Sequence, residues 1–175
     1  MATSLADLSN IRSRELFEEF SNVEFRDVWR ANDPQAEADA IAMWQRMGNL
    51  PQGVNPHARA KELCVVAYEN QRLIAITTVT LDMLQVVRTK MAFFRALVDD
   101  QHRAQKILVP LTYALHQAME RYAQAHPELK IGGTAAVVAA PNTIYKPIGS
   151  AEMILVGYTP RNEPVLLRWF DHYRF

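Results

Sequence analysis

Two basic residues, Arg103 and Lys106, lie in a polar turn between an apolar strand-like run at 91–98 and a helical pattern that starts near 107. A helix start offers unpaired backbone N–H groups and positive potential, so a strand, a basic turn and a helix in this order favour a phosphate site. Such turns usually contain glycine, which lets the backbone approach the ligand, and the turn at 99–106 has none. The pattern indicates either a phosphate site that relies on side chains or a plain connection.

Other side chains capable of chemistry have simpler interpretations. Asp99 and Asp100 could suggest acid–base catalysis, but adjacent residues of an extended chain point in opposite directions, and the pair is more typical of a turn. Cys64 stands in the apolar run ELCVVAY, which predicts a small core residue rather than a nucleophile. No metal site is expected, because no spacing typical of metal ligands links His57, His102, His116, His126 and His172.

The composition is that of an ordinary globular chain. Its 175 residues suffice for one domain with a buried core, and 49% of them are hydrophobic and 22% charged. Nineteen basic residues balance 19 acidic ones, which argues against nucleic acid or an anionic membrane as a partner. We find no long apolar run and no charged leader, and a lone cysteine suits a reducing compartment, so we expect a cytoplasmic protein.

Hydrophobic periodicity and turn residues divide the chain into alternating elements. A helix is expected within 1–21, and another should run from Pro34, behind Asp33, to a stop at Gly48. A long helix is expected over about 107–125, an irregular loop at 49–58, and a short turn or broken helix at 141–149. The expected strands cover 23–31, 62–69, 72–81, 91–98, 130–140, 151–159 and 164–175.

This order of elements predicts an α/β (α+β) fold built on a mixed, mostly antiparallel sheet. About six to seven strands are expected, with helices on both faces, and the helix at 107–125 should make strands 91–98 and 130–140 run parallel. The C-terminal run RWFDHYRF mixes basic and aromatic residues, as a nucleic-acid surface does, but its alternation better fits a half-exposed last strand. A homodimer paired through that strand is a further expectation.

The segments RAQKIL at 103–108 and NTIYKPIG at 142–149, placed in this order of elements, resemble the GNAT superfamily of acyl-CoA N-acyltransferases. The resemblance covers roughly residues 22–170 and lies in element order more than in identities. The family's loop motif is Arg or Gln, two residues, Gly, one residue, then Gly or Ala; Arg103 matches it, while Lys106 and Leu108 replace the small residues. The resemblance implies a single GNAT-like domain over 1–175, with the helix at 1–21 packed on it.

The resemblance also implies a cofactor site. Acetyl-CoA or another acyl-CoA would be the co-substrate, with its pantetheine arm beside the strand end at Leu97 and Val98. Its pyrophosphate would lie on the following loop, where Lys106 would give a charge directly to phosphate. The residues implied for this loop are Arg103, Ala104, Gln105, Lys106, Ile107 and Leu108.

The second segment carries the residue implied for catalysis. By the family pattern Tyr145 would protonate the departing CoA thiolate, and Asn142 would contact pantetheine, although it could equally cap a helix. Arg95 is unusual inside an apolar strand and could bind an anionic acceptor or a partner. No general base stands out, and the candidates are Asp82, Glu69 and Glu152.

The functional expectation is an N-acyltransferase that moves an acyl group from CoA to an amine by direct attack. The acceptor would be a small molecule or a protein amine, and the acceptor loops expected at 50–60 and 82–90 carry no recognisable code for it. The replaced small residues and the missing base support a second hypothesis, in which a GNAT-like domain without catalysis serves as a binding or assembly module.

Overall fold

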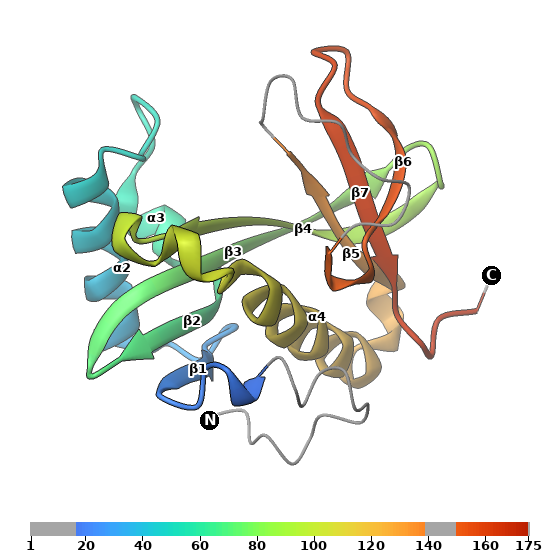
Figure 1. Ribbon diagram of the computed structural model, residues 1–175. Helices are drawn as coiled ribbons and strands as arrows, with labels where there is room; N and C mark the ends of the chain where they lie inside the picture. Colours follow the sequence, from blue (N-terminus) through green and yellow to red (C-terminus); the bar gives the residue numbers. More distant parts are fainter. Residues whose placement is uncertain (1–16, 139–149, 175) are drawn as a thin grey trace. The chain divides into compact units, whose positions relative to one another are not determined.

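Seven strands form one sheet in the computed structural model, which describes residues 17–138 and 150–174 (Figure 1). They are β1 (Val23–Asp27), β2 (Leu63–Glu69), β3 (Arg72–Leu84), β4 (Thr89–Val98), β5 (Ile131–Val137), β6 (Ile154–Tyr158) and β7 (Pro164–Trp169). Their order is β1-β2-β3-β4-β5-β7-β6. β4 and β5 run parallel, whereas β1–β2, β2–β3, β5–β7 and β6–β7 are antiparallel pairs. The predicted α+β fold with its parallel pair is confirmed.

Three α-helices and three short 3-10 turns that lie entirely within the described residues connect these strands. The helices are α2 (Pro34–Met47), α3 (Pro56–Ala60) and α4 (Leu108–Ala125), and the turns are η2 (Asp100–Gln105), η3 (Pro127–Leu129) and η4 (Ser150–Glu152). Within the described residues, no helix has both the length and the apolar character that crossing a membrane requires.

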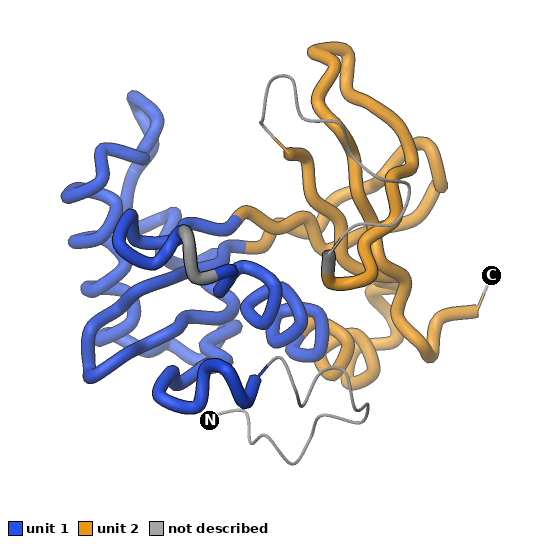
Figure 2. The backbone as a smooth tube through the Cα atoms, in the orientation of Figure 1, with its two compact units in different colours: residues 1–78, 96–118 blue, residues 79–95, 119–175 orange. Residues whose placement is uncertain are grey.

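The chain divides into two compact units (Figure 2). Unit 1 comprises residues 1–78 and 96–118, and unit 2 comprises residues 79–95 and 119–175. β3, β4 and α4 each pass from one unit into the other, so neither unit is a continuous stretch of sequence.

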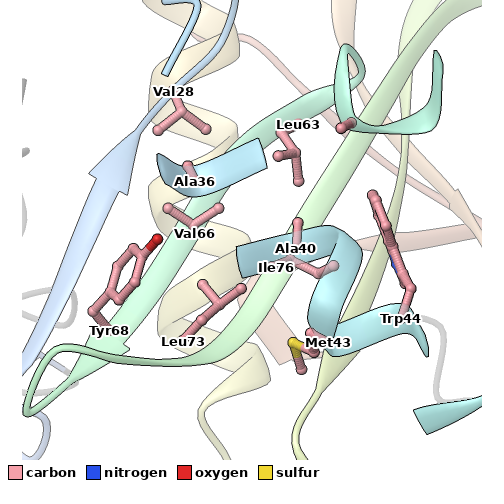
Figure 3. Packing of buried hydrophobic residues seen from close by; sticks show 11 residues of the cluster. Val28, Ala36, Ala40, Met43, Trp44, Leu63, Val66, Tyr68, Leu73 and Ile76 are labelled. Atoms are coloured by element: carbon pink, nitrogen blue, oxygen red, sulfur yellow. The ribbon is translucent and has the colours of Figure 1, made fainter. Parts of the chain in front are cut away.

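The core of unit 1 depends on α2, whose limits match the prediction. The Asp33 side chain accepts a hydrogen bond from the Ala36 N–H at 3.0 Å, Pro34 occupies the first turn, and Gly48 ends the helix at φ 63°. The face that α2 buries packs on β2 and β3 (Figure 3). This cluster includes Val28, Ala36, Ala40, Met43, Trp44, Leu63, Val66, Tyr68, Leu73 and Ile76.

The other face of these strands is also covered. Alternate strand residues point to opposite faces, and Val65 and Ala67 are as fully buried as Val66 between them. In Figure 3, α2 lies in front of the strands and α4 lies behind them. Helices therefore cover both faces, as the sequence predicts.

The hairpin of β2 and β3 turns at Asn70 and Gln71, both at positive φ (48° and 64°), which is the conformation of a tight two-residue hairpin. β3 is longer than predicted and ends at Leu84. The stretch at 82–90 is therefore two strand ends around a turn, in which the Val87 N–H donates to the Leu84 carbonyl at 3.2 Å.

Two predictions about local structure are wrong. The stretch at 49–58 is not irregular throughout, because it contains the start of α3. The Asn55 side chain accepts hydrogen bonds from the N–H groups of His57 and Ala58, with Pro56 in the first turn, which is a strong helix start.

The last strand also differs from the prediction. β7 ends at Trp169, and the chain then turns, with the Asp171 N–H donating to Glu120 at 2.8 Å. β7 lies between β5 and β6, so β6 rather than the last strand is at the edge of the sheet. The order of strands depends on contacts between distant segments, which local alternation does not encode.

Unit 2 has its own small core of Met91, Ala135 and Leu167, all fully buried. β5 and β7 approach closely at Gly133, where an added Cβ would lie 2.2 Å from the Arg168 carbonyl oxygen. A side chain at position 133 would push the two backbones apart, so glycine is required there.

Candidate functional site

The end of β4 provides the first part of the candidate site. The paired positions of β4 and β5 end at Phe93 opposite Ala135, and β4 continues to Val98. The Leu97 side chain packs against the α2 cluster, and the Val98 carbonyl accepts a hydrogen bond from Arg103 Nε at 3.4 Å. For Leu97, the backbone rather than the side chain is therefore the part that a ligand could use.

The loop that follows keeps the backbone shape expected of glycine without containing glycine. Lys106 has φ 57° and ψ 20°, which lies in the left-handed region and costs a residue with a Cβ about 1 kcal/mol. α4 then begins at Leu108, whose side chain is 48% exposed, whereas the neighbouring Ile107 is buried. At the two positions where the motif named above has small residues, this loop therefore has a left-handed lysine and, at the helix start, an exposed leucine.

Two cations lie on this loop. The Arg103 side chain is 58% exposed and forms an ion pair with Asp100 at 3.0 Å, and Lys106 is exposed. Pro110 stands in the first turn of α4 and has no N–H, which removes one of the donors that a helix start offers to an anion. Side-chain charge would therefore contribute more to anion binding here than in a glycine-rich loop.

A buried carboxylate anchors the beginning of the loop. Asp99 is 4% exposed; its side chain accepts from the Gln101 N–H at 3.1 Å and pairs with Arg46 at 2.5 Å and Arg72 at 3.2 Å. Burial by itself would raise the pKa of the Asp99 carboxyl. The Gln101 N–H and the two guanidinium groups outweigh burial and hold this pKa below its usual range.

Comparison with known proteins identifies the fold. No protein-family model and no curated protein sequence matches the chain. Among solved structures, the ribosomal-protein-S5-alanine acetyltransferase from Vibrio fischeri matches with a TM-score of 0.55 at 9% identity, covering 87% of this chain and 96% of that one. The ribosomal-protein-S18-alanine N-acetyltransferase from Escherichia coli matches with a TM-score of 0.54 at 12% identity, covering 87% and 99%. The chain has the GNAT fold.

A third structure agrees with this assignment. The GNAT-family acetyltransferase from Streptococcus pneumoniae has a TM-score of 0.51 at 13% identity, and the match covers 85% of this chain and 99% of that chain. At such low identity the likeness concerns the fold alone. It confirms that the resemblance seen in the order of elements is a resemblance of structure.

Not every residue predicted for a GNAT site falls in the described part of the chain. Tyr145 and Asn142 lie outside the described residues, so their predicted roles remain predictions. Ala104 and Gln105 belong to η2, between Arg103 and Lys106.

The three base candidates lie in different surroundings. Glu69 contacts His102 Nε2 at 3.1 Å and accepts from Asn22 at 2.6 Å, and Glu152 pairs with Arg168 at 2.9 Å. Asp82 is exposed in β3 and accepts from the N–H of the next residue at 2.7 Å. Glu69 and Glu152 thus already serve structural contacts.

Arg95 is exposed near the end of β4, which suits the suggested contact with an anion or a partner better than a core position would. Two residues not predicted from the sequence, Arg46 of α2 and Arg72 of β3, form ion pairs with Asp99. They are separated from Asp99 by 53 and 27 positions, and no local pattern connects them. Only the Asp-Asp pair, interpreted as a turn, pointed to this place.

Proposed function

We propose that the protein is an acyl-CoA-dependent N-acyltransferase that transfers an acetyl or related acyl group to an amine. The observation that carries the proposal is the loop between β4 and α4 of a GNAT fold. There Lys106 keeps the left-handed conformation of a glycine, and two cations are exposed at the start of α4. An anion at that place would meet both side-chain charge and the positive end of the helix.

Different residues of the loop and of the β4 end would bind different parts of the cofactor. Arg103 and Lys106 would neutralise the pyrophosphate, with backbone N–H groups of 104–108 adding hydrogen bonds. The backbone at Leu97 and Val98 would lie beside the pantetheine arm. Arg103 would exchange its contacts with Asp100 and the Val98 carbonyl for phosphate oxygens, which a half-exposed guanidinium can do at small cost.

Acyl transfer would occur in one direct attack. The neutral amine nitrogen bonds to the thioester carbonyl carbon, the carbon–sulfur bond breaks, and the electron pair leaves with sulfur as the CoA thiolate. Tyr145 would donate a proton to that thiolate, and the proton lost from the attacking nitrogen would pass to solvent or to a carboxylate of the acceptor side. The products are an amide and free CoA.

The acceptor would be the amine of a small molecule or of a protein. Two of the structures that share the fold carry names of enzymes acting on an alanine of a ribosomal protein. A protein N-terminus is therefore one acceptor class worth screening, beside small amines.

The test is calorimetric titration of the purified protein with acetyl-CoA and with free CoA. We expect micromolar binding that Arg103→Ala weakens tenfold or more, about 1.4 kcal/mol, because a phosphate contact is lost. Arg161→Ala is the matched control, since it removes the same charge from an exposed turn of unit 2. No heat and no thermal stabilisation at millimolar CoA would refute the acyltransferase.

One observation favours the alternative of a binding or assembly module without catalysis. Leu108 and Pro110 take away, within one turn of α4, both a small residue and an N–H donor. Absence of CoA binding in the same titration would favour this alternative, and the search would then turn to protein partners.

A further inference from the structure

We infer that Asp99 is the positioning residue of the cofactor loop, which contains no glycine. The inference rests on the proposed function, since it concerns the affinity of this loop for CoA. Asp99 itself would not touch the cofactor. It would act through the backbone of η2 and through Arg46 and Arg72, which hold its carboxylate.

Hydrogen bonds of Asp99 join the loop to the sheet and order its first residues. Its N–H donates to the Ile74 carbonyl of β3 at 2.8 Å, and its carbonyl accepts from the His102 N–H at 2.9 Å. Its side chain accepts from the Gln101 N–H at 3.1 Å. Asp99 therefore fixes the direction in which the chain leaves β4 and enters η2, the segment that carries Arg103.

Two arginines pair with the Asp99 carboxylate. Arg46 near the end of α2 and Arg72 at the start of β3 both reach Asp99 Oδ2, and each keeps about half of its side chain exposed, 50% and 52%. One buried carboxylate thus connects the loop to a helix and to a strand. Removing it would leave two guanidinium groups facing each other without a counter-charge, which would displace both them and the loop.

The loop at 99–106 contains no glycine. A loop without glycine has backbone conformations that cost free energy, such as the left-handed Lys106 at φ 57°. Such a conformation persists only when the surrounding contacts determine it. Among the residues of the loop whose side chains are described, Asp99 is the buried ionised one, so it is best placed to supply those contacts.

Substitution of the neighbouring Asp100 should change the affinity for CoA in the opposite direction to substitution of Asp99. Its side chain is 74% exposed and pairs with Arg103. Asp99→Asn and Asp100→Asn each remove one negative charge beside an anionic ligand, so electrostatics alone predicts tighter CoA binding for both. If Asp99 positions the loop, Asp99→Asn instead weakens CoA binding tenfold or more, while Asp100→Asn, which releases Arg103, binds equally or more tightly.

A second variant covers the case in which Asp99→Asn does not fold. Asp99→Glu keeps the charge but adds a methylene, so it moves the carboxylate away from the Gln101 N–H. Weakened CoA binding by Asp99→Glu, in a protein whose circular dichroism equals that of the wild type, supports positioning without any change of charge. Binding equal to that of the wild type overturns the inference.

Hydrogen exchange of the unaltered protein completes the test. The amides of Gln101 and His102 should exchange much more slowly than those of an unstructured chain, even without CoA, because Asp99 accepts both. Exchange at the unstructured rate overturns the inference. Wild-type protein that does not bind CoA refutes the proposed function itself, whereas wild-type binding that Asp99→Asn and Asp99→Glu leave undiminished refutes only the role of Asp99.

Discussion

At the scale of single residues, Lys106 adopts a backbone conformation that glycine favours. The left-handed conformation at this position is the one that glycine adopts freely and that a Cβ opposes. A lysine there costs some stability and, under the proposed function, would place a cation beside the pyrophosphate. Such a trade of stability for binding is common at functional sites.

Replacement of Lys106 by glycine measures the free energy cost of the left-handed conformation. Lys106→Gly should stabilise the protein by about 0.5–1 kcal/mol, because the strain at φ 57° disappears. Urea unfolding of the purified proteins checks it, with Lys106→Ala as the control, which removes the charge but keeps the strain. A gain of equal size for the alanine variant would contradict the argument, because the charge would then be the cause.

At the scale of elements, local sequence signals predict the helices and strands whose ends carry their own caps and turns. Asp33, Pro34 and Gly48 mark α2, and Asn70 with Gln71 marks the β2–β3 turn. These signals work because each acts within a few residues. The start of α3 carries an equally clear signal, Asn55 before Pro56, which the prolines and glycine of the surrounding stretch obscured.

The α2 cap gives a prediction at this scale. Asp33→Ala should lower the free energy of unfolding by about 1 kcal/mol, because the Ala36 N–H loses its acceptor. Denaturant unfolding followed by circular dichroism measures the loss. Asp33→Ser serves as the control, since a serine hydroxyl can accept the same hydrogen bond; a loss as large as that of Asp33→Ala would assign the effect to the ion pair with Arg26 instead.

The limits of prediction from sequence also lie between elements. The insertion of β7 between β5 and β6 and the meeting of Arg46, Arg72 and Asp99 depend on segments far apart in the chain. No periodicity records such contacts. The order of elements was enough to suggest the GNAT fold, but not to find the buried carboxylate at the start of the loop between β4 and α4.

At the scale of the whole molecule, the two units are linked by shared elements rather than by a linker. β3, β4 and α4 each contribute residues to both units. Because each of these elements is one continuous helix or strand, unfolding of its part in one unit is expected to destabilise its part in the other. Cooperativity between the units therefore follows from the path of the chain.

Tryptophan fluorescence can test this cooperativity. Trp44 is buried in the core of unit 1, and Trp169 stacks on Tyr173 in unit 2, with ring centroids 5.6 Å apart. Two variants that keep only Trp44 or only Trp169, made by phenylalanine substitution, should report the same urea midpoint as circular dichroism does on each. A fluorescence midpoint that differs from the circular dichroism midpoint of the same variant would show that the units unfold separately.

The burial of Cys64 has a practical consequence for enzymology. The chain has one cysteine, and its thiol lies in β2 with no exposed surface. A colorimetric thiol reagent added to the native protein should therefore find almost nothing to react with. The proposed acyl transfer would release one CoA thiol per turnover. Turnover on candidate amines could therefore be followed continuously at full enzyme concentration, without background from the enzyme and without mutating it.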